Sequence, residues 1–377
     1  MFLALRELIF ARGRFALMGS VVVLIAMLMV LLSGLSVGLA NDGVSGLKRL
    51  PVTSLAFQEH IKKDSAFSRS VVPSDAAETW AAQPGVAAAA PFGNTLVNAR
   101  TNHGLEIDMA LFGVEPGSFI DPDVAQGSRL GAAPDEVVIS ATAADEGVGL
   151  GDVITVEPFG TELRVVGILG AQHTFGHVEI GYLPLRTWQE VRAGVRPGDQ
   201  VPPSVYTAVT AIAVAAEDGA QVDLAAGDAA AGTTSMTKEE SYGASPGYTA
   251  ETSTLTMIEG FLYVISALVV GAFFTVLTIQ RRQEIAVMRA MGASTRYLLR
   301  DSLLQSAVLL VGSTGVGVGL GLAAGAAISS SPMPFALEAG PIAGATVLMV
   351  ALGMVGAAVA VVRITRVDPL IALGGGR

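Results

Sequence analysis

Four apolar stretches, each about 20 residues or longer, constrain this chain most strongly, because that length crosses the hydrocarbon core of a bilayer. They lie at 15–40, 256–279, 301–328 and 341–362. Of the 377 residues, 51% are hydrophobic and only 15% are charged, which is typical of several membrane spans and not of a soluble domain. The first stretch is too long for a secretory signal, and Gly38-Leu39-Ala40 is a weak cleavage site, so we predict a retained span.

Lysine and arginine are concentrated in three short segments, and this pattern predicts the orientation of the chain. Residues 1–14, 281–300 and 363–377 hold eleven of the 23 basic residues, whereas the loop 329–340 holds none. Short segments rich in basic residues remain in the cytoplasm. We therefore expect a multi-pass protein of the cytoplasmic membrane, with both termini in the cytoplasm and residues 41–255 outside.

Residues 41–255 predict a folded α+β domain. Strand-type runs lie at Val52–Phe57, Leu105–Phe112, Glu136–Ser140, Val153–Pro158, Leu163–Leu169, Val178–Pro184 and Tyr206–Val214. Helical stretches are predicted at Ser74–Ala82, Leu185–Ala193 and Ala220–Ala231. We expect Tyr182 and Trp188 to be core or interface aromatics, and the Ala/Gly-rich part near 215–235 to be flexible. The predicted fold class is an α-helical membrane protein with four transmembrane helices plus an α+β extracytoplasmic domain inserted between helices 1 and 2.

Several classes of protein are excluded by what the sequence lacks. It has no cysteine, which excludes disulfides, thiolate metal sites and cysteine nucleophiles. It also lacks a Walker A phosphate loop, an HExxH pattern, a Ser-His-Asp arrangement and a basic stripe for nucleic acid. We therefore expect a non-catalytic protein with no cofactor of its own and no nucleic-acid partner.

Two of the four histidines, His173 and His177, are spaced i, i+4. On a helix both would share one face, but Gly176 and the neighbouring strand-type runs argue against a helix here. We interpret them as exposed loop histidines, with a metal or haem ligand role as the alternative.

The second apolar stretch carries one carboxylate, Glu259, expected about one turn inside the outer interface. A charge within hydrocarbon is costly unless it is paired, hydrated or neutralised, so such an acid is a functional hypothesis. The alternative is that Glu259 reaches the headgroups or hydrogen-bonds a neighbouring helix. The polarizable and aromatic neighbours Met257, Phe261 and Tyr263 favour a functional site.

The order of the segments and two motifs resemble the MacB/FtsX-like permeases of ABC exporters. Residues 278–294 read TIQRRQEIAVMRAMGAS, which is similar to that family's R-x-x-E-I-A-V-x-R-A-x-G-A-S segment after its second span. Residues 366–373, RVDPLIAL, resemble the family's closing V-D-P-x-x-A-L. The resemblance covers essentially the whole chain, and 278–294 is its specific part.

Residues 245–248 (SPGY) and 254–262 (TLTMIEGFL) are most similar to a branch of DevC-like permeases that includes the HrtB-type haem exporters and glycolipid exporters. The resemblance implies the permease subunit of an ABC-type exporter, which removes a hydrophobic substrate, here by preference haem, from the outer membrane leaflet. It also implies a homodimer in the lipid bilayer. ATP and Mg²⁺ would be bound by a separate cytoplasmic ABC ATPase subunit, because this chain has no nucleotide-binding motif.

A ferric haem needs an apolar slot and an oxygen, nitrogen or sulfur ligand for its iron. Under the haem interpretation Glu259 is the candidate iron ligand, and Met27 is a further candidate for the slot. The predicted substrate-binding residues are Glu259, Met257, Tyr263, Phe261 and Met29. Two alternatives stay open: the same architecture exporting lipid, lipoprotein or peptide, and an FtsX-like scaffold that transmits ATPase motion to an outer hydrolase.

The cytoplasmic coupling segment 280–300 is expected to dock the ATPase, although basic residues alone also fit an ordinary positive-inside loop. The predicted coupling residues are Arg281, Arg282, Glu284, Met288, Arg289 and Gly292. Residues 1–14 predict an amphipathic segment along the inner leaflet, and residues 363–377 predict a cytoplasmic tail.

Small residues are frequent in the third and fourth spans. We expect them to be packing positions within the chain rather than a dimer motif. They are Gly312, Gly315, Gly317, Gly319, Gly321, Gly325, Gly340, Gly344, Gly353 and Gly356.

Overall fold

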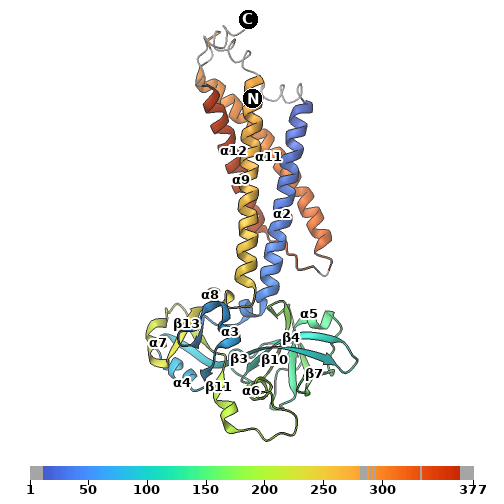
Figure 1. Cartoon of the computed structure of the whole chain (residues 1–377), viewed down its shortest axis with the longest axis vertical. Coiled ribbons are helices and arrows are strands. Elements are labelled where there is room, and N and C mark those ends of the chain that lie inside the picture. The colour runs from blue at the N-terminus through green and yellow to red at the C-terminus, as the bar shows by residue number, and fades with distance from the viewer. Residues whose placement is uncertain (1–11, 281–286, 288–290, 293, 332, 366–377) are drawn as a thin grey trace. The chain divides into compact units, whose positions relative to one another are not determined.

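The computed structural model describes residues 12–280, 287, 291–292, 294–331 and 333–365 (Figure 1). The chain divides into two compact units, one made of Met1–Leu39 with Thr252–Arg377 and the other of Ala40–Glu251. The first unit is a helix bundle and the second is an α+β domain inserted between its first and second helices. The predicted fold class is confirmed.

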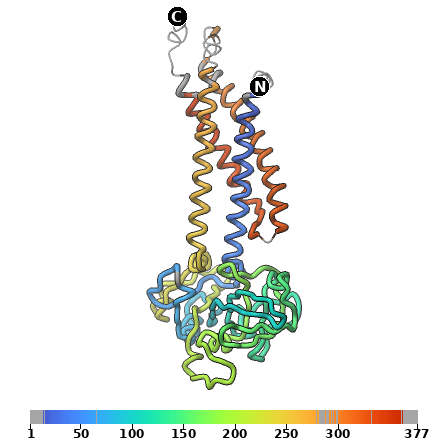
Figure 2. The backbone as a smooth tube through the Cα atoms, turned by 45° about the vertical axis from the view of Figure 1, so that its right-hand side comes forward, coloured from blue at the N-terminus to red at the C-terminus, as the bar shows by residue number. Residues whose placement is uncertain are grey.

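The bundle consists of four long helices, which Figure 2 traces as smooth tubes: α2 (Arg12–Arg49), α9 (Tyr248–Gln280), α11 (Thr295–Ile328) and α12 (Ala339–Thr365). Each contains an apolar part long enough to cross a membrane, at Phe15–Arg49, Tyr248–Leu277, Arg300–Ile328 and Ala339–Ala360. The helices are longer than the predicted apolar stretches. Their ends include polar residues, which form helix but are not included in a stretch defined by hydropathy. A kink interrupts α2 at Val44, whose φ is −147°.

All four long helices contribute to one buried cluster, formed by Phe15, Met18, Val22, Ala26, Met29, Val270, Phe274, Leu277, Leu310, Met349, Ala357 and Ala360. The outward faces are apolar as well, with Leu17, Leu268 and Val347 each about 70% exposed. Lipid tails are as apolar as these side chains, so the bundle is suited to a bilayer and not to water.

The glycines of α11 and α12 fall into two groups. A Cβ added at Gly317 would lie 2.4 Å from the carbonyl oxygen of Val23, and one at Gly356 would lie 2.5 Å from that of Ala267. Gly321, Gly325 and Gly353 also pack against neighbouring helices or the loop before α12. At the other five positions no described atom lies within 4 Å of such a Cβ: Gly312, Gly315, Gly319, Gly340 and Gly344. The prediction of internal packing positions is therefore right for the first group and wrong for the second.

The outer domain is built on one mixed sheet (Figure 1), in the strand order β13-β1-β12-β3-β4-β10-β6-β8-β5, with β7 beside β3 and β8 and β9 beside β10. The strands are β1 (Ser54–Gln58), β3 (Val86–Thr101), β4 (Glu106–Val114), β5 (Val124–Gly127), β6 (Glu136–Ile139), β7 (Val153–Glu157), β8 (Thr161–Leu169), β9 (Thr174–Phe175), β10 (Val178–Pro184), β12 (Ala211–Ala216) and β13 (Thr233–Thr237). A two-stranded sheet pairs β2 (Val72–Pro73) with β11 (Ala208–Val209). Only β10 with β4 and β6 with β8 are parallel among the described pairs.

Both faces of the main sheet are covered, as the alternation along β4 demonstrates. Met109 and Leu111 belong to one buried cluster, whereas Ala110 and Phe112 belong to another. Short helices and turns complete the domain: η1 (Lys63–Ser65), α3 (Ala66–Arg69), α4 (Ala76–Ala81), α5 (Ala141–Asp145), α6 (Leu185–Ala193), η2 (Pro203–Thr207), α7 (Leu224–Ala231) and α8 (Lys238–Tyr242).

Trp188 on α6 is fully buried above Gly93 and Gly113 of neighbouring strands, where any Cβ would lie within 2.5 Å of its side chain. Tyr182 is 1% exposed on the other face. The predicted burial of both aromatics is confirmed.

Local predictions for this domain differ in outcome. The strand at Val178–Pro184 and the helix at Leu185–Ala193 are confirmed. The segment 215–235, predicted to be flexible, contains α7 and the start of β13, whereas residues 217–223 form neither a helix nor a strand. The long strand β3 was missed because its Ala-rich start has weak strand propensity and is held by pairing with β12, far along the chain.

Candidate functional site

Glu259 lies on the inward face of α9, about three turns from the start of the helix. Tyr263, Ser266 and Val270 follow it at spacings of four, three and four residues, which place them on the same face. Glu259 and Tyr263 are half-buried, whereas Ser266 and Val270 are buried. The helix therefore presents an acid, a phenol and a hydroxyl in line along its packed side.

The structure separates the five predicted substrate residues into groups. Met257 and Phe261 lie on the opposite side of α9 and are 57% and 59% exposed. Met29 of α2 is buried in the bundle cluster against which Tyr263 also packs, and Met27 is half-buried. Glu259, Tyr263 and Met29 thus face the interior of the bundle, and Met257 and Phe261 face outward.

Within the described part of the chain, Glu259 has no hydrogen-bonding or ionic partner. Leu255, Leu262 and Tyr263 lie about one turn from it along α9. A carboxylate in such a setting is costly to leave alone. It can accept a hydrogen bond or coordinate a metal ion carried by a bound molecule. Ser266 was not predicted as a site residue. Its buried hydroxyl also has no partner among the described atoms. The only signal for it in the sequence is helical spacing, since Tyr263 follows Glu259 by four residues and Ser266 follows Tyr263 by three.

The predicted coupling residues fall almost entirely outside the described residues. Arg281, Arg282, Glu284, Met288 and Arg289 are in this group, as are residues 1–11 and 366–377. Gly292 is described, and its φ of 96° lies in the left-handed region that favours glycine. It follows the exposed Met291 in a turn, and the Ser294 hydroxyl then caps the start of α11 by accepting from the Tyr297 N–H. The described residues thus place a turn at Met291 and Gly292, ahead of α11.

His173 and His177 lie in a loop and a turn, as predicted, but both are half-buried, so the prediction that they are exposed is wrong. His177 bridges two carboxylates: its Nδ1 lies 2.8 Å from Asp42, and its Nε2 lies 3.0 Å from Glu251. These acids belong to the segments that enter and leave the domain, and their distance along the chain hid the contact from sequence analysis. Partial burial by itself would lower the pKa of His177, but the hydrogen bonds and negative charges of Asp42 and Glu251 outweigh burial and raise it.

His173 has a different setting. Its backbone N–H donates to the Ser140 hydroxyl, and burial lowers the pKa of its ring. Nearby Glu179 accepts from the Thr142 hydroxyl at 2.7 Å, and burial raises the pKa of its carboxyl. Among the described residues no group of three His, Asp or Glu side chains is arranged to hold a metal ion. His177 illustrates why, since its two carboxylates occupy opposite ring nitrogens.

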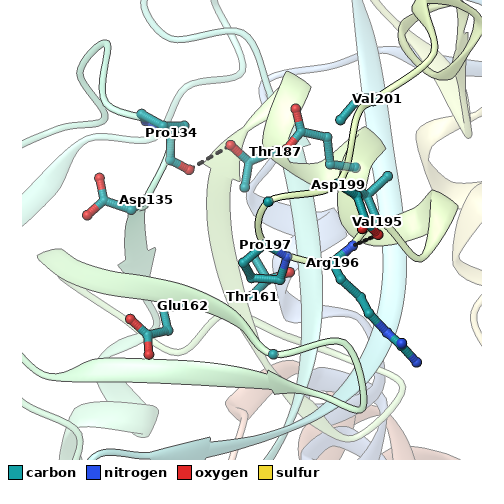
Figure 3. A pocket seen from close by; sticks show the side chains of 13 residues that line it. Pro134, Asp135, Thr161, Glu162, Thr187, Val195, Arg196, Pro197, Asp199 and Val201 are labelled. Carbon is teal, nitrogen blue, oxygen red and sulfur yellow. Dashed lines mark hydrogen bonds between the residues drawn. The ribbon is translucent and has the colours of Figure 1, made fainter.

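The outer domain also contains a polar cavity of about 570 Å³ between β6, the β7–β8 turn, α6 and the loop that follows it (Figure 3). Several of its polar groups are already paired. The Thr187 hydroxyl donates to the Pro134 carbonyl, the Arg196 N–H to Asp199, and Tyr206 to Glu190. Asp135 is likewise paired with Arg164. The cavity is acidic, and few of its polar side chains are left without a hydrogen-bonding or ionic partner among the described residues.

Comparison with protein families gives two matches that together span most of the chain. The model for the MacB-like periplasmic core domain matches residues 15–232. The model for the FtsX-like permease C-terminal region matches residues 256–369, which include α11, α12 and most of α9.

Individual relatives match over similar lengths. A Staphylococcus epidermidis protein named HrtB, the inferred permease of a hemin transport system, is 25% identical over 375 residues and covers 100% of this chain and 99% of its own. An uncharacterized ABC transporter permease of Mycobacterium tuberculosis is 25% identical over 301 residues, covering 78% of this chain and 77% of its own. The crystal structure of the extracellular domain of the noncanonic ABC-type transporter YknZ from Gram-positive bacteria aligns with a TM-score of 0.35 and 14% identity, covering 49% of this chain and 98% of that one.

Proposed function

Because the chain belongs to the MacB/FtsX family of ABC transporter permeases, we propose that it exports haem from the outer leaflet of the cell membrane. The family makes it a multi-pass membrane permease with an extracellular segment. The observation that carries the choice of haem is the full-length similarity to HrtB, whose name assigns it to hemin transport.

The placement of Glu259 supports this cargo. An unpaired, half-buried carboxylate on the inward face of a membrane helix needs a partner, and the iron of a ferric haem supplies one. Tyr263 lies one turn further along and packs against the cluster that contains Met29. Under this proposal Glu259 binds the iron while Tyr263 and Met29 contact the macrocycle. Met257 and Phe261 then act at the outward face of α9.

Energy for export is proposed to come from a separate cytoplasmic ABC ATPase that binds ATP and Mg²⁺. Its docking surface is the coupling segment 280–300, with Arg281, Arg282, Glu284, Met288, Arg289 and Gly292 as contacts. We further propose that two copies of the chain assemble, with their termini in the cytoplasm. ATP-driven closure on the inner side would then move the long helices and release haem outward.

The test of the cargo is a haem titration of the purified protein, followed through the Soret band. We expect a saturable shift that Glu259→Ala abolishes and Glu259→Gln weakens. Glu338→Gln changes an exposed carboxylate of the loop before α12 and should leave the titration unchanged.

Each other result has a definite meaning. A shift that survives Glu259→Ala moves the iron ligand to another side chain. Absence of a saturable shift rejects haem and leaves lipid, lipoprotein or peptide as the cargo. Binding of an extracellular hydrolase by the outer domain, without small-molecule transport, would favour the FtsX-like scaffold.

The test of the motor connection is co-purification with the ATPase. Arg289→Glu should reduce complex formation and transport-linked ATP hydrolysis, whereas Arg289→Lys keeps the charge and should retain both. Normal assembly and transport with Arg289→Glu would contradict the docking role of this residue.

A further inference from the structure

A second, smaller cavity of about 310 Å³ lies elsewhere in the outer domain, at the lower end of the size range of ligand-binding pockets. Segments far apart in the sequence form it: α3, β3, β9, the last turn of α6 and the loop before α9. The lining residues are Phe67, Ser68, Asn94, Thr95, Leu96, Phe175, Arg192 and Pro246.

Part of this cavity is apolar and rigid. The rings of Phe67 and Phe175 are buried and stack edge to face, with their centroids 5.0 Å apart. Leu96 is 48% exposed on β3, and Pro246 lies on the opposite chain segment. A small aliphatic or aromatic group can therefore be desolvated against these side chains.

Asn94 supplies an unused hydrogen-bond donor to this cavity. The residue is 4% exposed, and within the described part of the chain its Nδ2 has no partner. Its backbone is fully engaged, since the N–H donates to the Thr210 hydroxyl at 2.9 Å and the carbonyl accepts from it at 3.2 Å. Buried amide groups are nearly always satisfied, so an idle donor that lines a cavity indicates a missing acceptor.

Arg192 adds a cation beside that donor. Its guanidinium donates through Nη1 to Thr210 at 3.0 Å and through Nη2 to the Ser70 carbonyl at 3.0 Å, so the Thr210 hydroxyl connects Asn94 with Arg192. The guanidinium also lies 5.4 Å from the ring centroid of Trp188. No ion pair of the described residues involves Arg192, although burial of the cation lowers its pKa. With five N–H donors, the guanidinium has capacity left for a ligand.

We propose that this cavity binds a small carboxylic acid, with the carboxylate accepting from Asn94 and pairing with Arg192 while the apolar body packs on Phe67, Phe175 and Leu96. The site offers the Arg192 cation and the neutral Asn94 donor to a carboxylate, and its apolar wall to the hydrocarbon part of the ligand. A phosphate would leave several oxygens without donors. The site belongs to the outer domain, so it is independent of haem and of Glu259.

The experiment uses the full chain in nanodiscs of zwitterionic lipid, with 3-phenylpropionate, hexanoate and indole-3-acetate as probes and 3-phenylpropan-1-ol as the neutral match. Saturation-transfer NMR detects the ligand. We expect saturable binding of at least one of the three acids. The alcohol should bind at least tenfold more weakly than the acid that binds most tightly. Equal binding of acid and alcohol, or no saturable binding of any acid, would overturn the proposal.

Two substitutions separate a ligand site from a structural role. Asn94→Leu removes the donor at similar volume, so acid binding should fall at least tenfold while the Tm stays unchanged or rises. Arg192→Gln should weaken acid binding and leave alcohol binding unaltered. Asn98→Leu, on the same face of β3 but outside the cavity, is the control and should bind acid normally. Acid binding that survives Asn94→Leu would overturn the assignment, and a fall in Tm with intact binding would give Asn94 a structural role only.

Discussion

The helix bundle and the outer domain achieve cohesion with opposite kinds of residue. The outer domain packs large side chains, with Trp80, Trp188, Tyr182 and several phenylalanines fully buried around its sheet. The bundle relies on close backbone approach at small residues such as Gly317 and Gly356. Burial of large apolar side chains away from water is favourable because of the hydrophobic effect. This driving force is absent between helices in lipid, where close van der Waals contact stabilises packing instead.

Buried polar groups do not divide between the two units in the same way. Buried hydroxyls of the outer domain find partners in distant segments, as Ser45 does with Thr174. In the bundle, the Glu259 carboxylate and the Ser266 hydroxyl have no partner among the described residues. Unpartnered buried side-chain atoms occur in the outer domain as well, at Ser54, Asn94, Asp121 and Trp188 among the described residues. Of these four residues, Asn94 is the one that lines the cavity of about 310 Å³.

The largest expected effect is on the outer domain. Trp188→Ala should destabilise it by about 4 kcal/mol, because a fully buried indole leaves a cavity above two glycines that cannot fill it. Leu150→Ala, at a side chain that is 46% exposed, should change stability by less than about 0.5 kcal/mol. Thermal unfolding of the purified variants measures both, and a small loss for Trp188→Ala would contradict the role of large side chains here.

In the bundle, adding a methyl group should be the damaging change. Gly317→Ala places a Cβ 2.4 Å from the Val23 carbonyl oxygen and should cost about 2 kcal/mol. Gly315→Ala meets no described atom within 4 Å and should be neutral or stabilise the helix by up to about 1 kcal/mol. Thermal melts in the same detergent compare the two variants, and equal melts would remove the distinction between the two groups of glycines.

A smaller effect is expected where the outer domain pairs buried hydroxyls. Ser45→Ala removes the acceptor of the Thr174 N–H, a bond of 2.9 Å, and should cost about 1 kcal/mol. Ser118→Ala, whose hydroxyl donates to Glu115 on an exposed turn, serves as the control and should be close to neutral. A neutral Ser45→Ala measured by urea unfolding would show that these buried hydroxyls are not essential to the domain.

The smallest effect concerns His177 and depends on pH. Its folded pKa is raised above the ordinary 6.5, so its bridge stabilises the domain fully below that value and is lost as the pH rises through the folded pKa. The free energy of unfolding lost on His177→Gln should therefore be larger near about pH 6 than near about pH 9, by about 0.5 kcal/mol at most. Thermal melts at the two pH values measure this as a larger Tm difference from wild type at the lower pH. His173 is present in both proteins, so its opposite dependence cancels. A difference that grows with pH would exclude the charged bridge.

Structure that depends on local pattern could be predicted from the sequence, whereas structure that depends on distant contacts could not. Apolar length alone identified the four long helices, and the adjoining strand and helix at 178–193 followed from local pattern. Helical spacing along α9 would have placed Glu259 with Tyr263 and apart from Met257, but we grouped all three from composition. The His177 bridge and the cavity at Asn94 could not be predicted, because each brings together residues more than 70 positions apart.

One feature of the outer sheet bears on how such a chain could have been assembled. The first strand, β1, lies between β12 and the last strand, β13, and pairs antiparallel with both. The points where the polypeptide enters and leaves the domain are therefore neighbours, and the bridge from Asp42 through His177 to Glu251 joins them again. A domain with adjacent ends can be cut out and rejoined by a short connector, or exchanged for another with the same spacing, without rerouting the remaining chain. The ends of this domain therefore meet the geometric requirement for such an exchange.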